Sequence, residues 1–320
     1  MTRLVEGPPR SLSVMIPALN AGSVIDRCLD AVLAQDVDLD FDVVVSVGPS
    51  TDDTAARVDA RAAADARVRR IDNPTGATPV ALNRAIQSSQ GDLVVRVDAQ
   101  AELPAGYLRR IVETAEKTGA ANVGGIQRAV GDAPWSRAIA AAMRSRFGVG
   151  PAQFRSGSHE GATDTVYLGG FRRAALDHVG GYDESLIRNQ DYELNYRLRK
   201  AGFVVWLDPE LVVDYTPRPS LASLWSQYRQ YGKWKRIVVT RSPRSVRLRQ
   251  LAAPSLVLGL MVSVVLGVAG NPLGLIVPLI YLVAVAGFAA RPRGASRRRV
   301  ALAFIAMHLA WGFGFLFSWR

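Results

Sequence analysis

The stretch Gly91-Asp-Leu-Val-Val-Arg-Val-Asp-Ala-Gln100 runs from a β-branched segment straight into an acidic residue. Alternate residues of a strand point to the same side, so Asp98 and Gln100 are expected to present a pair of oxygens at the strand end. Oxygen ligands suit a hard divalent cation, which commonly takes a phosphate as its other partner. The structural alternative is a plain turn that starts at Asp98.

Short apolar runs alternate with amphipathic segments on both sides of this stretch. Strands are expected at Leu12–Ile16, Asp42–Val47, Arg67–Asp72, Leu93–Val97 and Ala121–Ile126, and helices at Ser23–Ala34, Thr54–Ala64, Pro79–Ser89 and Pro104–Thr118. This βαβα order predicts an α/β fold, a doubly wound and mostly parallel sheet with right-handed crossovers. Ligands bind such sheets at the carboxyl ends of the strands. Pro17–Asn20, Gly48–Asp53 and Asp98–Gln100 all fall there, which favours a ligand site over a plain turn.

Residues 130–235 are less regular. Trp135–Phe147 is expected to be helical, Gly148–Gly161 to be a mobile loop, and Tyr167–Phe171 is apolar and rich in glycine. Asn189–Lys200 has helical periodicity, with its apolar residues on one side.

Charge is divided unevenly along the chain. Residues 1–214 carry 24 Lys and Arg against 28 Asp and Glu, whereas residues 215–320 carry 15 basic residues and no acidic one. The arginines lie at the ends of apolar runs, which is the positive-inside pattern of membrane proteins. A nucleic-acid partner is excluded, because the part expected to be soluble is net negative. The single cysteine, Cys28, permits no internal disulfide and is expected on the buried face of the first helix.

The C-terminal third is expected to lie in a membrane. After a basic juxtamembrane linker (237–250), three runs of about 20 residues (251–270, 272–290 and 300–319) are each long enough to span a bilayer. With both arginine clusters inside, the first two runs form a hairpin and residues 11–236 lie in the cytoplasm, at the plasma membrane. The third run then crosses outward or lies in the interface. A hydrophobic helical core is the soluble alternative. Residues 1–10 form an N-terminal tail without a signal sequence.

An ordered series of motifs resembles the family 2 glycosyltransferases with the GT-A fold. The series is Val14-Met-Ile-Pro-Ala-Leu-Asn20, Gly48-Pro-Ser-Thr-Asp-Asp-Thr54, Gly76-Ala-Thr-Pro-Val-Ala-Leu-Asn-Arg-Ala-Ile86, Arg96-Val-Asp-Ala-Gln100, Gly169-Gly-Phe-Arg-Arg173, Gly180-Gly-Tyr-Asp-Glu184 and Asn189-Gln-Asp-Tyr-Glu-Leu-Asn-Tyr-Arg-Leu-Arg199. The resemblance covers residues 11–236, with a nucleotide-sugar half (11–128) and an acceptor half (129–236). The chain looks most like the bacterial exopolysaccharide type, similar to succinoglycan glucosyltransferases, which carry a comparable hydrophobic tail.

The resemblance implies a role for each matched residue. Asp191 would be the catalytic base, although Asn189 or Asp191 could also simply cap the helix that follows. Asp98 and Gln100 would hold Mn²⁺ or Mg²⁺ and offset the charge of the departing diphosphate. The other donor-side residues would be Pro17, Asn20, Ser50, Asp52, Asn83 and Arg96, and the acceptor-side loops would contribute Gly169, Gly170, Arg172 and Tyr182.

Three departures from the family pattern affect these roles. Val47 and Gly48 stand where the second loop usually has two acids, so a uridine donor is not assured. Gln100 is a neutral and weaker ligand, and His159 or Asp164 is a candidate to complete the metal shell. Gln190 replaces an acid, which should leave the pKa of Asp191 lower than in an acidic pair.

Gln230-x-x-Lys233-Trp234 resembles the Gln-x-x-Arg-Trp element of membrane polysaccharide synthases, with Lys in place of Arg. Lys233 and Trp234 would then close over the donor diphosphate. The alternative is an amphipathic helix that lies in the membrane interface and uses Trp and Lys as anchors.

The sequence therefore predicts a membrane-anchored inverting glycosyltransferase. Its donor would be a nucleotide sugar, and its acceptor a polyprenyl-linked saccharide or glycolipid among the inner-membrane lipids. A processive polysaccharide synthase is the rival within the enzyme class, although three spans are too few for an export channel. A non-catalytic membrane scaffold that retained the fold is the rival outside it. No protein partner is indicated.

Overall fold

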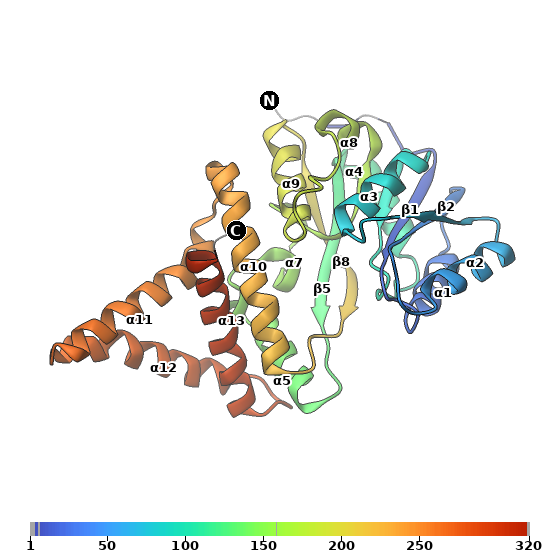
Figure 1. Ribbon diagram of the computed structural model, residues 1–320. Coiled ribbons are helices and arrows are strands. Elements are labelled where there is room, and N and C mark those ends of the chain that lie inside the picture. Colours follow the sequence, from blue (N-terminus) through green and yellow to red (C-terminus); the bar gives the residue numbers. More distant parts are fainter. Residues whose placement is uncertain (1–3, 6, 158, 319–320) are drawn as a thin grey trace. The chain divides into compact units, whose positions relative to one another are not determined.

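The computed structural model describes residues 4–5, 7–157 and 159–318 (Figure 1). The chain forms two compact units. The first comprises residues 1–127 and 157–214, and the second residues 128–156 and 215–320. These bounds differ from the predicted division at residues 128 and 236, because 128–156 and the helix after residue 220 pack with the apolar C-terminal helices.

The first unit is built on an eight-stranded sheet. Its strands are β1 (Leu12–Ala18), β2 (Phe41–Val47), β3 (Val68–Asp72), β4 (Leu93–Arg96), β5 (Asn122–Ala129), β6 (Gly161–Ala162), β7 (Tyr167–Arg172) and β8 (Val205–Tyr215), in the order β3-β2-β1-β4-β7-β5-β8-β6. The strands β1 to β4 are parallel, as predicted. Beyond β4 the sheet is mixed, since β7 runs antiparallel to both of its neighbours and β6 antiparallel to β8.

Helices cover both faces of this sheet, as a doubly wound fold requires. They are α1 (Ile25–Leu33), α2 (Thr54–Ala64), α3 (Thr78–Ser88), α4 (Tyr107–Thr118), α8 (Arg173–Val179) and α9 (Gln190–Lys200). Strand alternation divides the core: Val14 and Ile16 pack in one cluster with α1 and α4, while Met15 packs in the other with α3 and α9. Cys28 is buried on α1 as expected, and burial raises the pKa of its thiol to about 12, so the thiol stays neutral at physiological pH.

The chain turns earlier after β4 than the sequence predicts. The strand ends at Arg96, and the Ala101 N–H donates to the Asp98 carbonyl (2.8 Å), which closes a turn. Gln100 lies in this turn and is exposed. The expectation that strand alternation aligns Asp98 with Gln100 is therefore wrong, because the strand has already ended.

The second unit is helical. It contains α5 (Pro134–Met143), α6 (Arg146–Val149), α7 (Gln153–Ser156), α10 (Leu221–Arg241), α11 (Ala252–Val268), α12 (Ile276–Ala289) and α13 (Arg297–Phe317), with short 3-10 turns at Pro243–Ser245, Leu248–Gln250 and Pro272–Leu275. The predicted loop at Gly148–Gly161 thus includes α7 and the end of α6. Alanines of α5 pack with Phe304 and Met307 of α13 in a common core.

Two glycines let α10 and α13 approach closely. A Cβ on Gly232 would lie 2.1 Å from the Trp311 carbonyl oxygen, and one on Gly314 would lie 2.1 Å from the Arg229 carbonyl oxygen. Only hydrogen fits at both positions, so the two backbones pack directly against each other. This packing explains why α10 belongs to the helical unit, although the motif series extends to residue 236.

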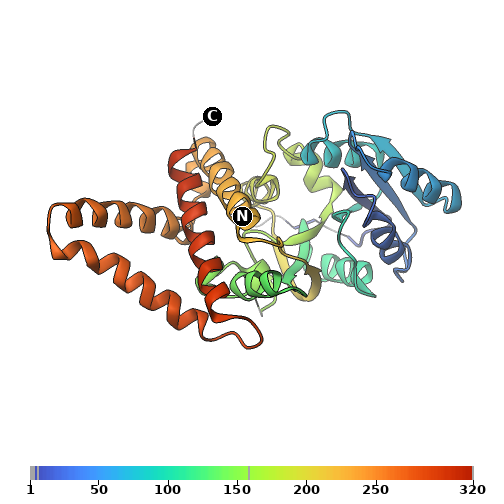
Figure 2. The same cartoon turned by 60° about the horizontal axis from the view of Figure 1, so that its bottom comes forward.

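Two helical segments, Pro272–Ala289 and Arg297–Phe317, are long and apolar enough to cross a membrane. The first predicted span forms α11, which at 17 residues is shorter than the other two. Figure 2 shows α11 and α12 as a helical hairpin, as predicted. Many large apolar side chains on these two helices are exposed, such as Val265, Val268 and Leu279. Residue 319, the last of the third predicted run, lies outside the described residues.

Candidate active site

A buried arginine joins the two carboxylates that the sequence singles out. Arg96, the last residue of β4, is 8% exposed. Its Nε and Nη2 donate to Asp98 Oδ1 at 2.9 and 2.8 Å, and its Nη1 donates to Asp191 Oδ1. Arg96 lies on a strand, Asp98 in the turn after it and Asp191 in the first turn of α9, so three separate elements converge. We call these three residues the Arg96 triad.

The Arg96 triad lies at the carboxyl end of β4, next to the carboxyl end of β1. This is the edge at which ligands bind open α/β sheets. The side chains of Asp98 and Asp191 remain 17% and 39% exposed, so both carboxylates are reachable from solvent. The two bonds from Arg96 to Asp98 both use Oδ1, which leaves Oδ2 as the oxygen available to a ligand.

Opposing effects act on the catalytic-base candidate. Burial raises the pKa of Asp191, Arg96 lowers it and the nearby carboxylate of Asp98 raises it, with a net rise above its ordinary value. Gln190, which replaces an acid of the family pattern, was expected to leave Asp191 without a like charge beside it. The structure supplies another acid, Asp98, from a distant part of the chain. A carboxylate of raised pKa that is still ionised near neutral pH is a stronger base.

Tyr182 and Asn83 complete the inner wall of this site. The Tyr182 hydroxyl is buried beside Arg96 and Asp191, and burial raises the pKa of Tyr182 far above its ordinary range. Asn83 of α3 holds the loop that contains Tyr182 and Glu184. Its Nδ2 donates to the Tyr182 carbonyl and to Glu184 Oε1 (both 2.9 Å), and its Oδ1 accepts from the Tyr182 N–H (2.8 Å). The expected donor-side role of Asn83 is therefore accompanied by a positioning role.

The two loops expected to bind the nucleoside are tied together. The Asn20 N–H donates to Ser50 Oγ (3.0 Å), and Asn20 Oδ1 accepts from the Thr51 N–H (2.8 Å). Asp52 accepts from the Gly22 N–H (2.9 Å) and from the Thr54 hydroxyl (2.5 Å). These bonds, chiefly the one from Thr54, hold the pKa of Asp52 below its ordinary value. Pro17 is half-buried near the end of β1. The predicted grouping of Pro17, Asn20, Ser50 and Asp52 at the carboxyl ends of the strands is therefore confirmed.

The acceptor-side prediction is only partly matched. Gly169, Gly170 and Arg172 lie within β7, not in a loop. A Cβ on Gly170 would lie 2.5 Å from Ile111 Cγ2, so this glycine is needed for packing under α4. Arg172 pairs with Leu93 at the start of β4, and its Nη2 donates to the Ala115 carbonyl (3.0 Å). Arg172 therefore lies beside the start of β4, whereas Asp98 follows its end, and an acceptor-side role for Arg172 stays a prediction.

The candidate metal ligands are not gathered. Among residues 4–5, 7–157 and 159–318, no three His, Cys, Asp or Glu side chains are placed to hold one ion. His159 is exposed, and Asp164 is buried at 7% exposure. Of the predicted ligands, Asp98 has the hard oxygen donor and the accessibility that a divalent cation needs. Gln100, exposed in the same turn, stays a predicted ligand, and the donor phosphates and water would supply others.

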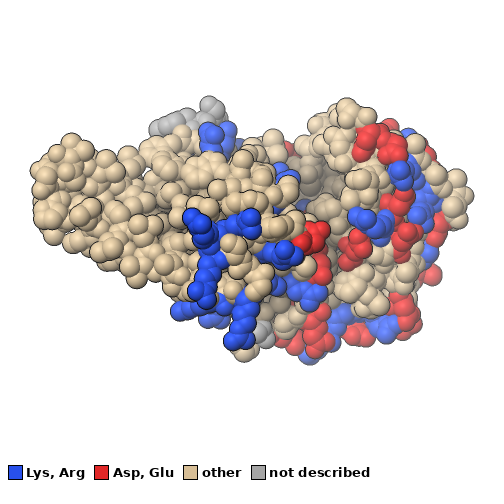
Figure 3. Space-filling view, turned by 90° about the horizontal axis from the view of Figure 1, so that it is seen from below, with Lys and Arg blue, Asp and Glu red and all other residues tan. Residues whose placement is uncertain are grey.

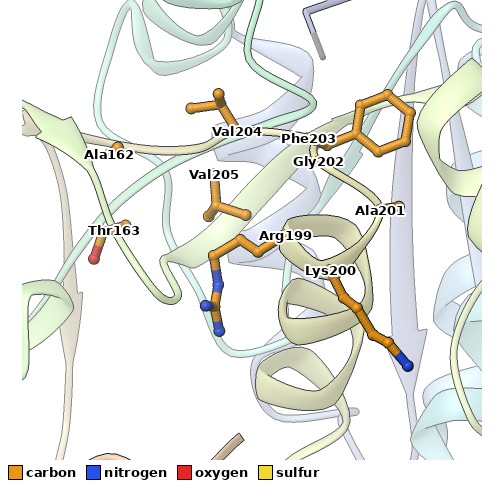
Figure 4. Close-up of a pocket in the computed structure, with 9 residues that line it drawn as sticks. All are labelled: Ala162, Thr163, Arg199, Lys200, Ala201, Gly202, Phe203, Val204 and Val205. Carbon is orange, nitrogen blue, oxygen red and sulfur yellow. The ribbon is translucent and has the colours of Figure 1, made fainter. Parts of the chain in front are cut away.

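Lys233 and Trp234 are half-buried on α10. This helix belongs to the second unit, and the suggested closure over the diphosphate stays a prediction. A pocket of about 690 Å³ lies at the far end of α9 from Asp191, between the last helical turn and β8. Figure 4 shows Arg199 and Lys200 extending to opposite sides of that turn. The eight residues from Asp191 to Arg199 correspond to about 12 Å of helix, so this pocket is separate from the Arg96 triad.

The family model described as "Glycosyltransferase like family 2" matches residues 8–236. The chain belongs to this family. It is 33% identical over 316 residues to the succinoglycan biosynthesis protein ExoA of Rhizobium meliloti, across 96% of this chain and 93% of that protein. It is also 25% identical over 239 residues, 72% of this chain and 74% of the other, to a dolichyl N-acetyl-α-D-glucosaminyl phosphate 3-β-D-2,3-diacetamido-2,3-dideoxy-β-D-glucuronosyltransferase of Methanococcus voltae.

Solved structures agree with the GT-A fold. The mannosyltransferase PcManGT of Pyrobaculum calidifontis, in complex with GDP-Man and Mn²⁺, superposes with a TM-score of 0.66 at 20% identity, covering 97% of this chain and 89% of that one. Residues 1–349 of S. aureus TarS, in complex with UDP-GlcNAc, give a TM-score of 0.51 at 16% identity, over 76% of this chain and 67% of that one. The protein is thus a family 2 glycosyltransferase with a GT-A fold.

Sequence reasoning named all three residues of the Arg96 triad but missed that they are joined. It assigned Arg96 to the donor and treated Asp191 separately. The available signal was an arginine inside an otherwise apolar strand, because a buried arginine requires acidic partners. Tyr167 was not singled out as a site residue. Burial raises its pKa far above the ordinary range, and the charges of Asp98 and Arg96 also act on it.

Proposed function

We propose that this protein is an inverting, membrane-associated glycosyltransferase that moves a sugar from a nucleoside-diphosphate donor to a lipid-linked or glycolipid acceptor. The observation that carries the proposal is the Arg96 triad at the carboxyl end of the parallel strands. It provides one accessible carboxylate for the donor side and a second, of raised pKa, for the acceptor. The family membership and the two GT-A structures solved with nucleotide sugars support it.

Asp191 would act as the base. An acceptor hydroxyl is a poor nucleophile near neutral pH and needs a base within hydrogen-bond reach. Asp191 lies in the first turn of α9, where the helix dipole favours the ionised carboxylate. Arg96 orients its Oδ1, and the exposed part of the side chain can accept the proton. A single base that attacks from the side opposite the leaving group gives inversion.

Asp98 would serve the departing diphosphate. Arg96 fixes its Oδ1, and Oδ2 would hold Mn²⁺ or Mg²⁺. When bound, the cation would offset the negative charge that develops on the leaving group. The Arg96 triad itself has a formal charge of −1, which suits a divalent cation better than it suits an unaccompanied diphosphate. Asn20, Ser50 and Asp52 would shape the nucleoside pocket through the two loops that they join.

The membrane and the acceptor follow from the second unit and from the relatives. Two helical segments are long enough to span a bilayer, and the named relatives act in succinoglycan biosynthesis and on a dolichyl-linked sugar phosphate. We place the catalytic unit in the bacterial cytoplasm at the plasma membrane, because the arginine-rich ends of the apolar helices favour that side. The product would enter a cell-surface polysaccharide or glycolipid.

The test is sugar transfer by detergent-purified protein. UDP-, GDP- and TDP-sugars would be supplied with membrane lipid extract and with Mn²⁺, Mg²⁺ or EDTA. We expect cation-dependent release of one nucleoside diphosphate together with a labelled lipid product. Asp191→Asn should lower kcat by about 10²- to 10⁴-fold while donor binding is kept, and Asp98→Ala should weaken cation-dependent donor binding.

The matched control is Asp177→Asn, an exposed acid on α8 outside the motif series. It should transfer sugar normally. Donor binding with no transfer in wild type under every acceptor condition would support the scaffold alternative. A product that grows by many sugars per binding event would support a processive synthase.

A further inference from the structure

A basic pocket in the helical unit brings together two segments that are about 150 residues apart in sequence. It has a volume of about 440 Å³ and is lined by Arg144 and Arg146 from the α5–α6 junction and by Arg291 and Arg293 from the α12–α13 connection, with Ala141, Ser145, Phe288 and Pro292. We call it the four-arginine pocket. Arg291 and Arg293 belong to the arginines at the ends of the apolar runs, whereas Arg144 and Arg146 lie outside the C-terminal third.

The four guanidinium groups have no carboxylate partner among the described residues. The helical unit carries 20 Lys and Arg and a single acid, Asp132. That carboxylate accepts from the Ala133 N–H (2.8 Å) and the Ser136 hydroxyl (3.2 Å) at the start of α5. The positive charge of the four-arginine pocket is therefore not compensated within its own unit. Figure 3 shows Lys and Arg gathered beside the charge-free surface of the apolar helices.

Helix stability does not explain this charge. Arg297, Arg298 and Arg299 occupy the first turn of α13, which follows the pocket. The N-terminal end of a helix carries a partial positive charge, so basic residues there are unfavourable. Arg299 lies over the Trp135 ring (5.8 Å to the centroid), whereas Arg297 and Arg298 are exposed, so these residues extend the basic surface beyond the pocket. The connection lies between two segments long enough to span a bilayer, which places it at a membrane surface if they do.

The floor of the four-arginine pocket is rigid. The Phe288 ring stacks on Phe147 (centroids 4.5 Å apart, planes 1° apart), and the Arg291 guanidinium lies 4.1 Å from the Phe288 centroid. Phe147 packs edge-on against Phe304, and its carbonyl is 2.8 Å from His308 Nε2 on α13. Arg291 thus lies on a packed aromatic group, and Arg146 directly precedes Phe147 of the same group in the chain; such packing reduces the entropy lost when a ligand binds.

We infer that the four-arginine pocket binds the phosphate group of an anionic membrane lipid. Guanidinium groups bind phosphate oxygens in bidentate pairs, and basic pockets beside the ends of membrane helices suit lipid headgroups. Phe288 and the apolar surface of α12 would contact the first acyl carbons. The inference rests on the membrane association that we propose for the helical unit, but not on sugar transfer.

The test measures lipid binding by the full-length protein in detergent, by titration and native mass spectrometry. The probes are dioctanoyl phosphatidylglycerol, dioctanoyl phosphatidylcholine and inorganic diphosphate. Wild type should retain the phosphatidylglycerol and not the phosphatidylcholine. The double variant Arg144→Gln/Arg291→Gln, which takes one arginine from each segment, should bind the anionic lipid roughly tenfold more weakly or worse.

The control variant is Arg297→Gln/Arg298→Gln, which removes the same charge from exposed positions that do not line the pocket. It should stay within about threefold of wild type, because screened charges outside a site contribute little. Equal losses in both variants would overturn the inference in favour of general attraction to the basic surface. Binding of diphosphate as tight as that of the lipid would overturn the lipid assignment in favour of a soluble phosphate.

Each double variant must also show a wild-type melting temperature without lipid, and Arg144→Lys/Arg291→Lys, which keeps the charge, should recover part of the binding. Failure of the proposed function is recognised separately. A protein that binds phosphatidylglycerol but transfers no sugar contradicts the enzyme proposal alone. A protein that transfers sugar but shows no headgroup preference contradicts this inference alone.

Discussion

Replacing Arg96 by Met tests the central claim that one guanidinium positions both carboxylates of the site. Methionine has a similar length and no charge, so the packing around the end of β4 changes little. The variant loses three charge-assisted bonds, two to Asp98 and one to Asp191. It also leaves two carboxylates facing each other without a cation.

The expected loss of stability is about 3 kcal/mol. A hydrogen bond between charged groups contributes roughly 1.5–3 kcal/mol, but the two bonds to Asp98 share one oxygen and count as little more than one. The bond to Asp191 is discounted, because 39% of that side chain is exposed and water screens it. For a unit of this size, such a loss lowers the melting temperature by roughly 6–12 °C.

The pH dependence of activity gives a second and independent readout. Arg96 lowers the pKa of Asp191, whereas burial and Asp98 raise it. Without the arginine the pKa of Asp191 rises further, so a smaller fraction of the base is ionised at pH 7. The acidic limb of the kcat/KM profile should therefore move to higher pH, and part of the lost activity should return as the pH is raised.

Arg96→Lys is the matched variant. It keeps the charge but offers one point donor in place of the planar fork, so it should lie between wild type and Arg96→Met in both melting temperature and pH profile. The reasoning is refuted if Arg96→Met melts within about 2 °C of wild type. It is also refuted if the acidic limb stays in place or moves to lower pH.

Three further predictions concern the supports of the site and the fold. Asn83→Ala removes three bonds to the Tyr182 loop and should cost about 2 kcal/mol in stability with a lower kcat, whereas exposed Arg84→Ala should change neither in melting and transfer assays. Burial alone would raise the pKa of Asp208, but bonds from Arg110, Thr114 and the Glu210 N–H outweigh it and lower the pKa. Asp208→Asn should therefore be less stable than wild type above about pH 4, the ordinary pKa of an aspartate. Denaturation curves at several pH values should show this difference in stability shrinking as the pH falls through the lowered pKa of Asp208. A difference that does not depend on pH would contradict this. Gly314→Ala places a Cβ 2.1 Å from a carbonyl of α10 and should cost about 2–3 kcal/mol by overpacking, while Gly287→Ala, with open space around it, should melt like wild type.

The parallel half of the fold could be predicted because each of its signals is local. The short, continuously buried apolar runs of β1 and β2 and the amphipathic helices between the strands depend only on near neighbours. The antiparallel half of the sheet could not be predicted from such local signals. The position of β7 between β4 and β5 follows from contacts among segments about 50 to 80 residues apart. The sequence shows only that Tyr167–Phe171 is apolar and glycine-rich.

The same distinction applies to the site. Asn20, Ser50 and Asp52 were correctly brought together, because strand order alone places their loops at one edge. Gln100 was misplaced, since the strand ends at Arg96 and a hydrogen bond from the Ala101 N–H to the Asp98 carbonyl closes a turn there. The two compact units also divide the chain differently from the predicted halves. Charge was counted from residue 215, although residues 128–156, with Arg144 and Arg146, pack with the C-terminal helices.

Two buried arginine–aspartate groups in the first unit differ in a way that separates structure from function. Asp208 is fully buried, and Arg110, Thr114 and a backbone N–H saturate its oxygens. In the Arg96 triad the carboxylates stay partly exposed, and one oxygen of Asp98 is left for a ligand. Buried ion pairs are weak evidence for stability, since apolar side chains of similar volume are often as stable. A folding requirement would favour the saturated arrangement of Asp208. The unsaturated one at the strand ends is the arrangement that binding a charged substrate requires.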